Sequence, residues 1–467
     1  MTDGRFDSKV LQFWQRRLSL DLRSLATARI LAGIITVADV AFRALHLRQF
    51  YTEEGLVPRS VLIRVYPTLS FPSLHVANDT VYYVALLFLL HALVGLALLL
   101  GYRTRTSSVL SWLLLMSLQA RNPLVLNGGD ILLAALLFWG MFLPWGRVWS
   151  LDARMSVQKE QVQVFSAATV GLTFQVASLY LFAALHKLEP AWTEGSAVYY
   201  ALSIESFATS HARFLLSHPQ WLPWLTWSVL AFEFVALWLL ISSNTTVRMI
   251  GVAGCACLHL GFGAFLDIGL FRWVPLIGLC ALIPSRAWGK EVPTISDELH
   301  KSVQSFFLLS VTALTLAVNI DTLGQGRHQF VPSLLKGFSP VFASWQNWNV
   351  FTGGSLYSSG WYAIEIETHS GQHFDVWHND QPFSVKKPTL ISNDYATQRW
   401  RKWTMISGTL LKTPHLNRHV MQWWLQEWNR RHPEDTGKNL KYWYFHQPTY
   451  LDFRDAPTEK VLLGEYP

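Results

Sequence analysis

The chain has 467 residues, of which 51% are hydrophobic and only 15% charged, and its mean hydropathy is +0.22. With 22 tryptophans, this composition excludes an ordinary soluble globular protein and indicates a polytopic membrane protein. The net charge of +7 does not indicate nucleic-acid binding, because the basic residues are scattered and the positive-inside rule explains those between apolar segments.

Apolar runs along the first two thirds of the chain predict nine transmembrane helices, since each span needs about 17 to 25 residues. The expected spans cover roughly residues 25–45, 81–101, 107–121, 128–145, 165–186, 222–243, 248–268, 270–285 and 303–320. The eighth is short. The polar N-terminus shows no cleavable signal pattern, so we expect the first span to remain in the protein.

The distribution of Lys and Arg predicts the orientation. Basic residues precede the first span and recur in alternate connections, which the positive-inside rule places in the cytoplasm. They are Arg5, Lys9, Arg16, Arg17, Arg23, Arg103, Arg105, Arg147, Arg154, Lys159, Arg248, Arg286, Lys290 and Lys301. Nine spans then leave the C-terminal segment outside, although the first outer loop also carries Arg48, Arg59 and Arg64.

The segment after about Asp321 has an ordinary polar composition, which predicts a second, soluble unit. We expect a cytoplasmic segment over 1–24, a transmembrane domain over 25–321 and a soluble domain over 322–467. In the last part, Trp361 to Trp377 has a strand–turn–strand pattern and Val420–Trp428 a helical one. The predicted fold is an all-α polytopic membrane domain followed by a small α+β domain.

Two outer connections are elaborate, namely Arg48–Asp79 and Lys187–Trp221. The second contains a half-apolar segment, 197–207, which is too short to span and predicts a re-entrant or interfacial helix.

All three cysteines, Cys255, Cys257 and Cys280, lie in apolar spans, so the tail has no disulfide. Cys255 and Cys257 diverge by about 200° around a helix, which argues against a metal or disulfide pair. The sequence has no zinc spacing, phosphate loop or serine nucleophile elbow.

Lys187 stands at the mouth of the fifth span, and Pro190 then stops the helix. Hydrocarbon disfavours the charged form of a lysine, so this amine could act as a neutral base. A nearby carboxylate would oppose that effect, and the candidates are Glu189, Glu194, Asp130 and Asp267. Snorkelling of Lys187 to the interface explains the position equally well.

Several other ionisable residues fall inside or beside the spans, where they usually face a bundle interior or a cavity. Asp39 and Arg43 are spaced for an ion pair within one helix, with His46 one turn later. His91, Glu233 and His259 lie deep in apolar runs. On the predicted topology, Asp130, Lys187, Asp267 and Arg272 share one membrane level.

Two short motifs at that level each have a structural and a functional interpretation. Asn127-Gly-Gly-Asp130 opens a span, and either a helix cap or a binding site explains it. Asp267 to Arg272 breaks the chain between two spans, and either a turn with an internal salt bridge or a site explains it.

A set of motifs in fixed order covers about residues 20 to 290. They are Gly101-Tyr-Arg-Thr-Arg105, Arg121-Asn-Pro, Asn127-Gly-Gly-Asp130, Trp149-Ser-Leu-Asp152, His186-Lys-Leu-Glu-Pro-Ala-Trp-Thr-Glu-Gly195, His259 and Asp267-Ile-Gly-Leu-Phe271. Through these residues the chain resembles the vitamin K-dependent γ-carboxylase-like membrane family, also called the horizontally transferred transmembrane domain family.

The resemblance implies a bacterial inner-membrane enzyme with a periplasmic tail. It implies that Lys187 deprotonates a reduced vitamin K, here a menaquinol-like quinol. In the carboxylases, the oxygenated quinone then removes a γ-proton from a glutamate, and carbon dioxide adds. The implied catalytic residues are Lys187, His186 and His259. The implied substrate- and cofactor-binding residues are Asn127, Asp130, Trp192, Glu194, Asp267 and Arg272.

The chain also departs from the animal carboxylases. Gly128 or Gly129 stands where they carry a functional histidine, their disulfide cysteines have no counterpart, and the tail is shorter. Two hypotheses follow. The first is a carboxylase-like enzyme acting on a quinol and on a peptide or small-molecule substrate. The second is a non-enzymatic membrane protein that binds or passes a ligand while its tail binds a partner.

Overall fold

The computed structural model describes most of the chain. The described ranges are 3–65, 72–155, 163–289, 294–299, 302–324, 330–344, 346–353, 357–451 and 457–467. For residues 3–8, 65 and 410 the structure describes the backbone only. Three of the basic residues assigned to cytoplasmic connections, Lys159, Lys290 and Lys301, lie outside these ranges.

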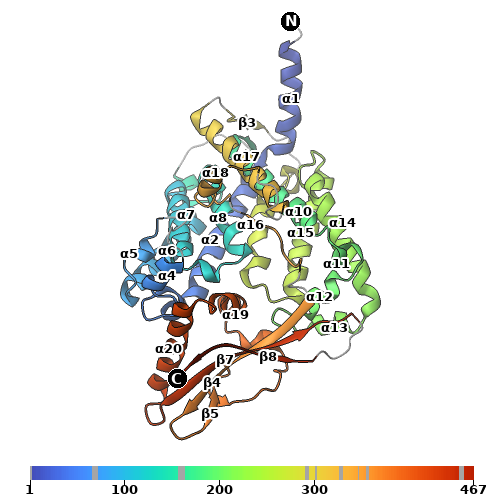
Figure 1. Cartoon of the computed structure of the whole chain (residues 1–467). Helices are drawn as coiled ribbons and strands as arrows, with labels where there is room; N and C mark the ends of the chain where they lie inside the picture. Colours follow the sequence, from blue (N-terminus) through green and yellow to red (C-terminus); the bar gives the residue numbers. More distant parts are fainter. Residues whose placement is uncertain are drawn as a thin grey trace.

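A bundle of helices forms the body of the molecule, with helix α1 at one end and a β-rich C-terminal part at the other (Figure 1). The longer bundle helices are α2 (Leu22–Ala44), α6 (Val81–Leu100), α7 (Thr104–Arg121), α8 (Gly128–Gly140), α10 (Ala167–His186), α14 (Leu222–Leu240), α15 (Thr245–Phe265), α16 (Val274–Ala281) and α17 (Val303–Leu323).

Shorter helices lie in the connections. They are α3 (Leu47–Tyr51), α4 (Arg59–Val65), α5 (Leu74–Ala77), α9 (Leu151–Arg154), α11 (Pro190–Thr193), α12 (Ala197–Ser203), α13 (Ala212–Leu216) and α18 (Ser333–Phe338), with 3-10 turns at Pro123–Val125, Pro219–Trp221, Gly269–Arg272, Ser285–Ala287 and Ile391–Asp394. Helix α1 covers Asp3–Leu18.

Six helices in the described residues are long and apolar enough to cross a membrane. They are Leu22–Ala44, Val81–Leu100, Ala167–His186, Pro219–Leu240, Thr245–Phe265 and Val303–Leu323. The predicted count of nine is therefore not confirmed. Helix α8 has 13 residues and spans only about 20 Å, less than the hydrocarbon thickness. Helix α16 is shorter still, and α7 carries two arginines and four serines.

A small sheet closes the end of the bundle next to α1. Strand β2 (Gln163–Phe165) lies between β1 (Leu20–Asp21), which is antiparallel to it, and β3 (Ile295–Asp297), which is parallel. Three connections distant in sequence therefore meet at this end.

The C-terminal part has the α+β character that the sequence predicts. Its antiparallel sheet has the order β6-β5-β4-β7-β8, and Glu365 pairs with Asp375 across the predicted strand–turn–strand. The strands are β4 (Ser358–Thr368), β5 (His373–Asp375), β6 (Gln381–Pro382), β7 (Gly437–Pro448) and β8 (Glu459–Tyr466), and the helices α19 (Gln398–Leu410) and α20 (Pro414–Arg431).

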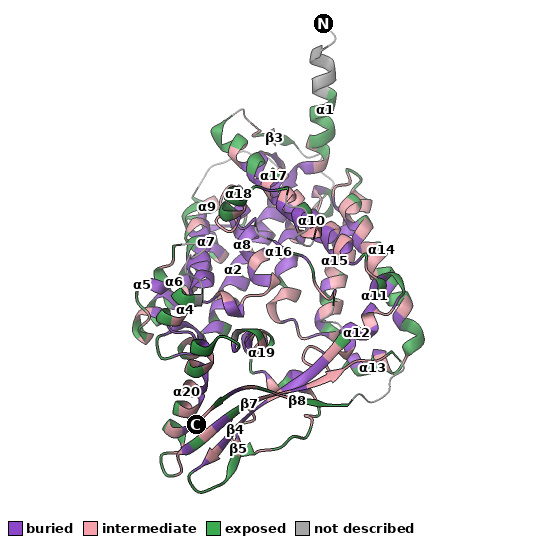
Figure 2. Cartoon of the chain, in the orientation of Figure 1, coloured by how far each residue is buried: buried purple, intermediate pink, exposed green. Residues whose placement is uncertain are grey.

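The C-terminal part docks on the bundle through apolar side chains. One buried cluster contains Phe50 and Tyr51 from the first outer connection together with Trp400, Trp403 and Trp424 from α19 and α20. Figure 2 shows buried residues continuing from the bundle into α19 and the central strands. The two parts thus share a core, and α19 lies against the end of the bundle.

Residues 339–344 and 346–353 return into the bundle without forming a helix. Ser344 Oγ lies 2.8 Å from Thr315 Oγ1 of α17, and the amides of Gln346 and Gln175 bond each other at 2.8 and 2.9 Å. Trp348 is buried in the bundle core. Irregular backbone is tolerated at membrane depth only where protein or a cavity satisfies its polar groups. Gln346 Nε2 supplies part of this by donating to the Ala343 carbonyl at 2.8 Å.

Candidate functional site

Lys187 closes the C-terminal end of α10 and is buried there. Its Nζ donates to Oε1 and Oε2 of Glu233 on α14, at 2.9 and 2.7 Å. The two side chains are 5% and 4% exposed. Pro190 starts α11 three residues later, so the chain turns away just past the amine. Lys187 therefore points at a carboxylate within the protein rather than out to the bilayer surface.

The residues after Lys187 fold back over it. The ring centroid of Trp192 lies 5.0 Å from Lys187 Nζ, and the indole N–H donates to the Phe351 carbonyl at 2.9 Å. The carboxylate of Glu189 accepts from the N–H of Gly353 at 2.9 and 3.0 Å. The returning residues 346–353 thus hold the loop that covers the amine.

His259 of α15 is buried near this pair. Its Nε2 lies 3.1 Å from the Tyr180 hydroxyl of α10, and the rings of Phe262 and Phe271 lie 6.3 and 5.7 Å from its own. Among the described residues Nδ1 has no hydrogen-bond partner. A buried polar atom without a partner is costly, so Nδ1 is available to bond a ligand.

Asp130 belongs to a second buried cluster, a network of two carboxylates and two guanidiniums. Arg43 donates to Asp39 at 2.7 Å and also to Asp130. Arg399 of α19 donates to Asp39 at 2.8 Å and to both oxygens of Asp130 at 2.5 and 2.6 Å. The four charges sum to zero. The network ties α2 and α8 to the C-terminal part.

The Asn127-Gly-Gly-Asp130 motif forms a helix cap and also contacts other elements. Asn127 Oδ1 accepts from Gly129 N, and Asp130 Oδ2 accepts from Asn127 N, both at 2.8 Å. Asn127 Nδ2 donates to Gln398 at 2.9 Å. A Cβ on Gly129 would lie 3.3 Å from Phe271 Cα, so a side chain here would press on that residue.

Asp267 and Arg272 do not pair with each other. Asp267 accepts from Arg401 of α19 at 2.8 Å, while Arg272 donates to the Gly263 carbonyl at 3.2 Å. The internal salt bridge considered for this turn is therefore replaced by a contact with the C-terminal part.

The two remaining candidates lie at the edge of the Lys187 site. His186 Nε2 lies 3.1 Å from Thr322 Oγ1 of α17, and Glu194 is exposed. Neither bonds Lys187.

The acid beside Lys187 is Glu233, not Glu189, Glu194, Asp130 or Asp267. In the sequence, Glu233 stood out only as an acid deep in an apolar run. Because an unpaired charge there is costly, that position indicated that Glu233 needs a basic partner, but not which one. Arg399 was missed, because an arginine in a polar tail carries no sign of burial.

A buried lysine–glutamate pair, a histidine and apolar rings inside apolar helices define an integral membrane protein with an internal polar site. The chain belongs to the HTTM domain family, whose model matches residues 18–288. It is similar to the sporulation-delaying protein SdpB of Bacillus subtilis (strain 168), with 27% identity over 244 residues that cover 49% of this chain and 71% of that protein. No solved structure matches the chain. The matched range includes Lys187, Glu233 and His259 but not the C-terminal part.

Proposed function

We propose that the chain is a membrane enzyme in which the Lys187–Glu233 pair takes a proton from a lipid-soluble acid, of which a menaquinol-like quinol is the leading example. The observation that carries the proposal is the buried amine bonded to both oxygens of one carboxylate. The resemblance to the vitamin K-dependent carboxylases supports it independently, because Lys187 matches the lysine that acts as the base there.

The pair can supply a base without placing net charge in the membrane. When Nζ passes a proton to Glu233, the products are a neutral amine and a carboxylic acid, so the site stays neutral overall. The lone pair of the amine then accepts a proton from the bound acid, which restores the ammonium. That ammonium and the new anion stabilise each other in a medium of low dielectric constant.

The residues around the pair fit an aromatic hydroxyl compound. Trp192 beside Lys187, and Phe262 and Phe271 beside His259, make the surroundings apolar, and His259 Nδ1 offers a hydrogen bond to a polar substituent. A quinol bound there would supply an acidic hydroxyl and two reducing equivalents. Carboxylation of glutamate is not part of the proposal, since Gly128 or Gly129 occupies the place of the carboxylase loop histidine.

The alternative is a non-enzymatic membrane protein that binds or passes a ligand. One observation favours it. A buried ion pair with a purely structural role also needs good geometry and covering side chains, and the bidentate Lys187–Glu233 pair under the Trp192 ring has both. The name of the similar Bacillus subtilis protein describes a delay of sporulation and no reaction.

Mass analysis of the lipids extracted from the purified full-length protein separates the two functions. The enzyme predicts a retained quinone that is lost from Lys187→Ala and kept by Lys438→Ala, a change at an exposed lysine of β7. A quinone-free protein in which Lys187→Ala alters nothing supports the binding protein instead.

A further inference from the structure

Two of the sequence motifs meet at the end of the bundle far from Lys187. The motif beginning at Gly101 contacts the motif ending at Asp152: the N–H of Asp152 donates to Gly101 O at 3.0 Å, and its carboxylate accepts from Arg103 N and Thr104 N at 2.8 and 2.7 Å. Gly101 has φ +68, and a Cβ there would lie 2.3 Å from Ser150 Cβ. Contact this close fixes the two loops together.

Arg29 of α2 fixes the same loops from inside the bundle. Its guanidinium donates to four backbone carbonyls, those of Leu98, Leu99, Trp145 and Trp149, at 2.5 to 3.1 Å. Trp149, with φ +52, holds a left-handed conformation that is rare for an aromatic residue. Such strain persists only where the surroundings impose it, and it often accompanies a binding site.

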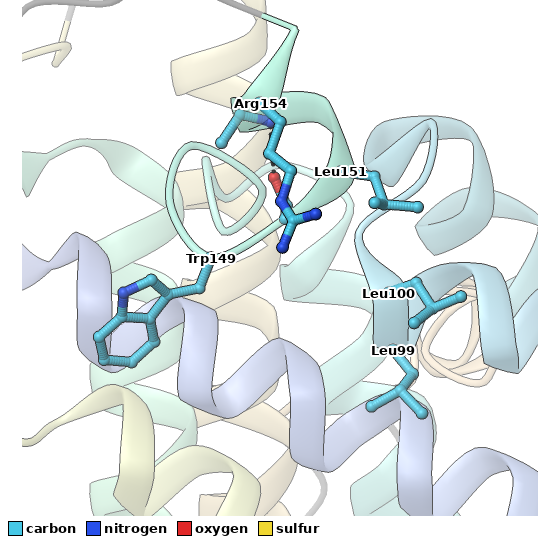
Figure 3. A pocket seen from close by; sticks show the side chains of 7 residues that line it. Leu99, Leu100, Trp149, Leu151 and Arg154 are labelled. Atoms are coloured by element: carbon cyan, nitrogen blue, oxygen red, sulfur yellow. Dashed lines mark hydrogen bonds between the residues drawn. The ribbon is translucent and has the colours of Figure 1, made fainter.

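These loops line a cavity of about 590 Å³ that is open to the surface and that no part of the proposed chemistry uses. It is lined by Leu99, Leu100, Trp149, Ser150, Leu151, Ala153 and Arg154. In Figure 3 the Arg154 guanidinium lies between the Trp149 indole and the leucine side chains. The lining therefore combines a cation, an exposed indole and an apolar wall.

Charge near the cavity favours an anionic occupant. Arg154 is exposed, and Asp152, the nearest acid along the chain, is directed to the backbone of the neighbouring loop. Partial burial raises the pKa of Asp152, but the hydrogen bonds from Thr104 and Arg103 outweigh it and hold that pKa below its ordinary value. Asp152 thus stays bonded to the neighbouring loop and does not line the cavity.

An apolar track leads from the cavity along α6. Leu89, Leu93, Leu96 and Leu100 follow helical spacing on one face, and all four are exposed. Because α6 is one of the helices able to span a membrane, this face suits an acyl chain. A leucine track ending at a tryptophan and an arginine matches a lipid tail below a charged headgroup.

We propose that this cavity binds an anionic glycerophospholipid, with the phosphate at Arg154 and an acyl chain on the leucine face of α6. The site is distinct from the Lys187 site and does not rest on the proposed enzymatic function. Its ligand is a resident membrane lipid, which would stabilise the junction of the two motif loops.

Native mass spectrometry of the full chain in detergent tests the site, with phosphatidylglycerol and phosphatidylcholine as probes. We expect phosphatidylglycerol to bind more tightly, and Arg154→Gln to weaken it about fivefold, the usual contribution of one surface arginine. Ala153→Phe, which fills the cavity and keeps the charge, should weaken both lipids. Arg105→Gln, at an exposed arginine of the same end, should change neither.

Three results would overturn the proposal. The first is wild-type binding of both lipids by Arg154→Gln and Ala153→Phe. The second is a loss in Arg105→Gln as large as in Arg154→Gln, which would mean diffuse surface charge. The third is displacement of phosphatidylglycerol by equimolar glycerophosphoglycerol, its water-soluble headgroup. That would identify a free phosphate compound as the ligand.

Discussion

At the scale of single residues, the contact between Lys187 and Glu233 decides what the membrane site can do. An amine can exchange its proton with the carboxylate it touches, whereas a permanently charged group cannot. Both groups are buried, so removal of either one leaves an unpaired charge, which typically costs about 3 to 5 kcal/mol. Variants at this pair must therefore be checked for folding before their activity is interpreted.

Lys187→Arg separates proton transfer from charge pairing. Arginine keeps the positive charge and the ion pair with Glu233, but it does not release its proton at any relevant pH. We expect quinol turnover, or growth that depends on it, to be abolished while membrane expression stays normal. Wild-type behaviour of Lys187→Arg would remove Lys187 from the mechanism and leave the ligand-binding protein as the better function.

The interactions of single residues were predictable where the partner is close in sequence. Asp39 and Arg43 stand one helical turn apart, and they pair as their spacing predicts. Asn127 and Asp130 form a cap for the same reason. Lys187 and Glu233 lie 46 positions apart on different helices, and spacing within one helix cannot show which faces of two helices meet.

At the scale of elements, α19 is held to the bundle by charge as well as by aromatic packing. Its Arg399 bonds Asp39 and Asp130, and its Arg401 bonds Asp267. The positively charged helix α19 thus forms ion pairs with three acids of the membrane part, which come from three different segments. This docking was not predictable, because the sequence presents α19 only as a basic, aromatic run in a polar tail.

Arg399→Met should loosen the C-terminal part. The change leaves Asp39, Arg43 and Asp130 with one uncompensated buried negative charge, at a cost of about 3 to 5 kcal/mol. Limited proteolysis of the purified protein should then cut between the bundle and the C-terminal part at lower protease concentration. Arg430→Met, at an exposed arginine of α20, is the matched control. Equal protection of both variants would show that aromatic packing alone holds α19.

The turn between β5 and β6 contains a histidine, His378, whose charge should matter for stability. His378 Nδ1 lies 2.6 Å from Asp375 and Nε2 lies 3.3 Å from Asp394. Burial lowers the pKa of His378, but the effect of the two carboxylates is larger and raises that pKa to about 9. Since this pKa exceeds the ordinary value of 6.5, the stabilisation is complete below about pH 6.5 and is lost as pH rises through about 9.

Thermal unfolding of the full chain between pH 6 and pH 10 measures this effect. The midpoint of wild type should exceed that of His378→Gln most at pH 6, and the gap should shrink towards pH 10. A gap that is constant with pH would mean that His378 acts through packing and not through its charge.

At the scale of the whole molecule, composition predicted the division into an apolar helical part and a polar α+β part. Hydropathy located the long helices because the bilayer fixes their length. It could not fix the span count, since α8 and α16 are short and α7 is polar. The return of residues 339–344 and 346–353 into the bundle was not predictable either, because Ser344 and Gln346 bond partners far away in sequence.

The arrangement of the two ends leads to a test of topology. Connections with basic residues gather at the end that carries the β1-β2-β3 sheet: the rings of Trp149 and Trp288 lie 5.3 Å apart there, and Arg147 pairs with Glu298 next to β3. The C-terminal sheet lies at the opposite end (Figure 1). From the positive-inside rule we expect the first end to face the cytoplasm and the C-terminal part to face outward.

Reporter fusions should therefore give three readings. A fusion at Asp152 and one at Trp288 should both report the cytoplasm, because both sites belong to the basic end, and a fusion at Lys438 in β7 should report the outside. Opposite readings at Asp152 and Trp288 would contradict the structure itself, since those loops are in contact. A cytoplasmic reading at Lys438 would contradict the proposed orientation, because β7 lies at the end of the bundle opposite to the basic connections (Figure 1).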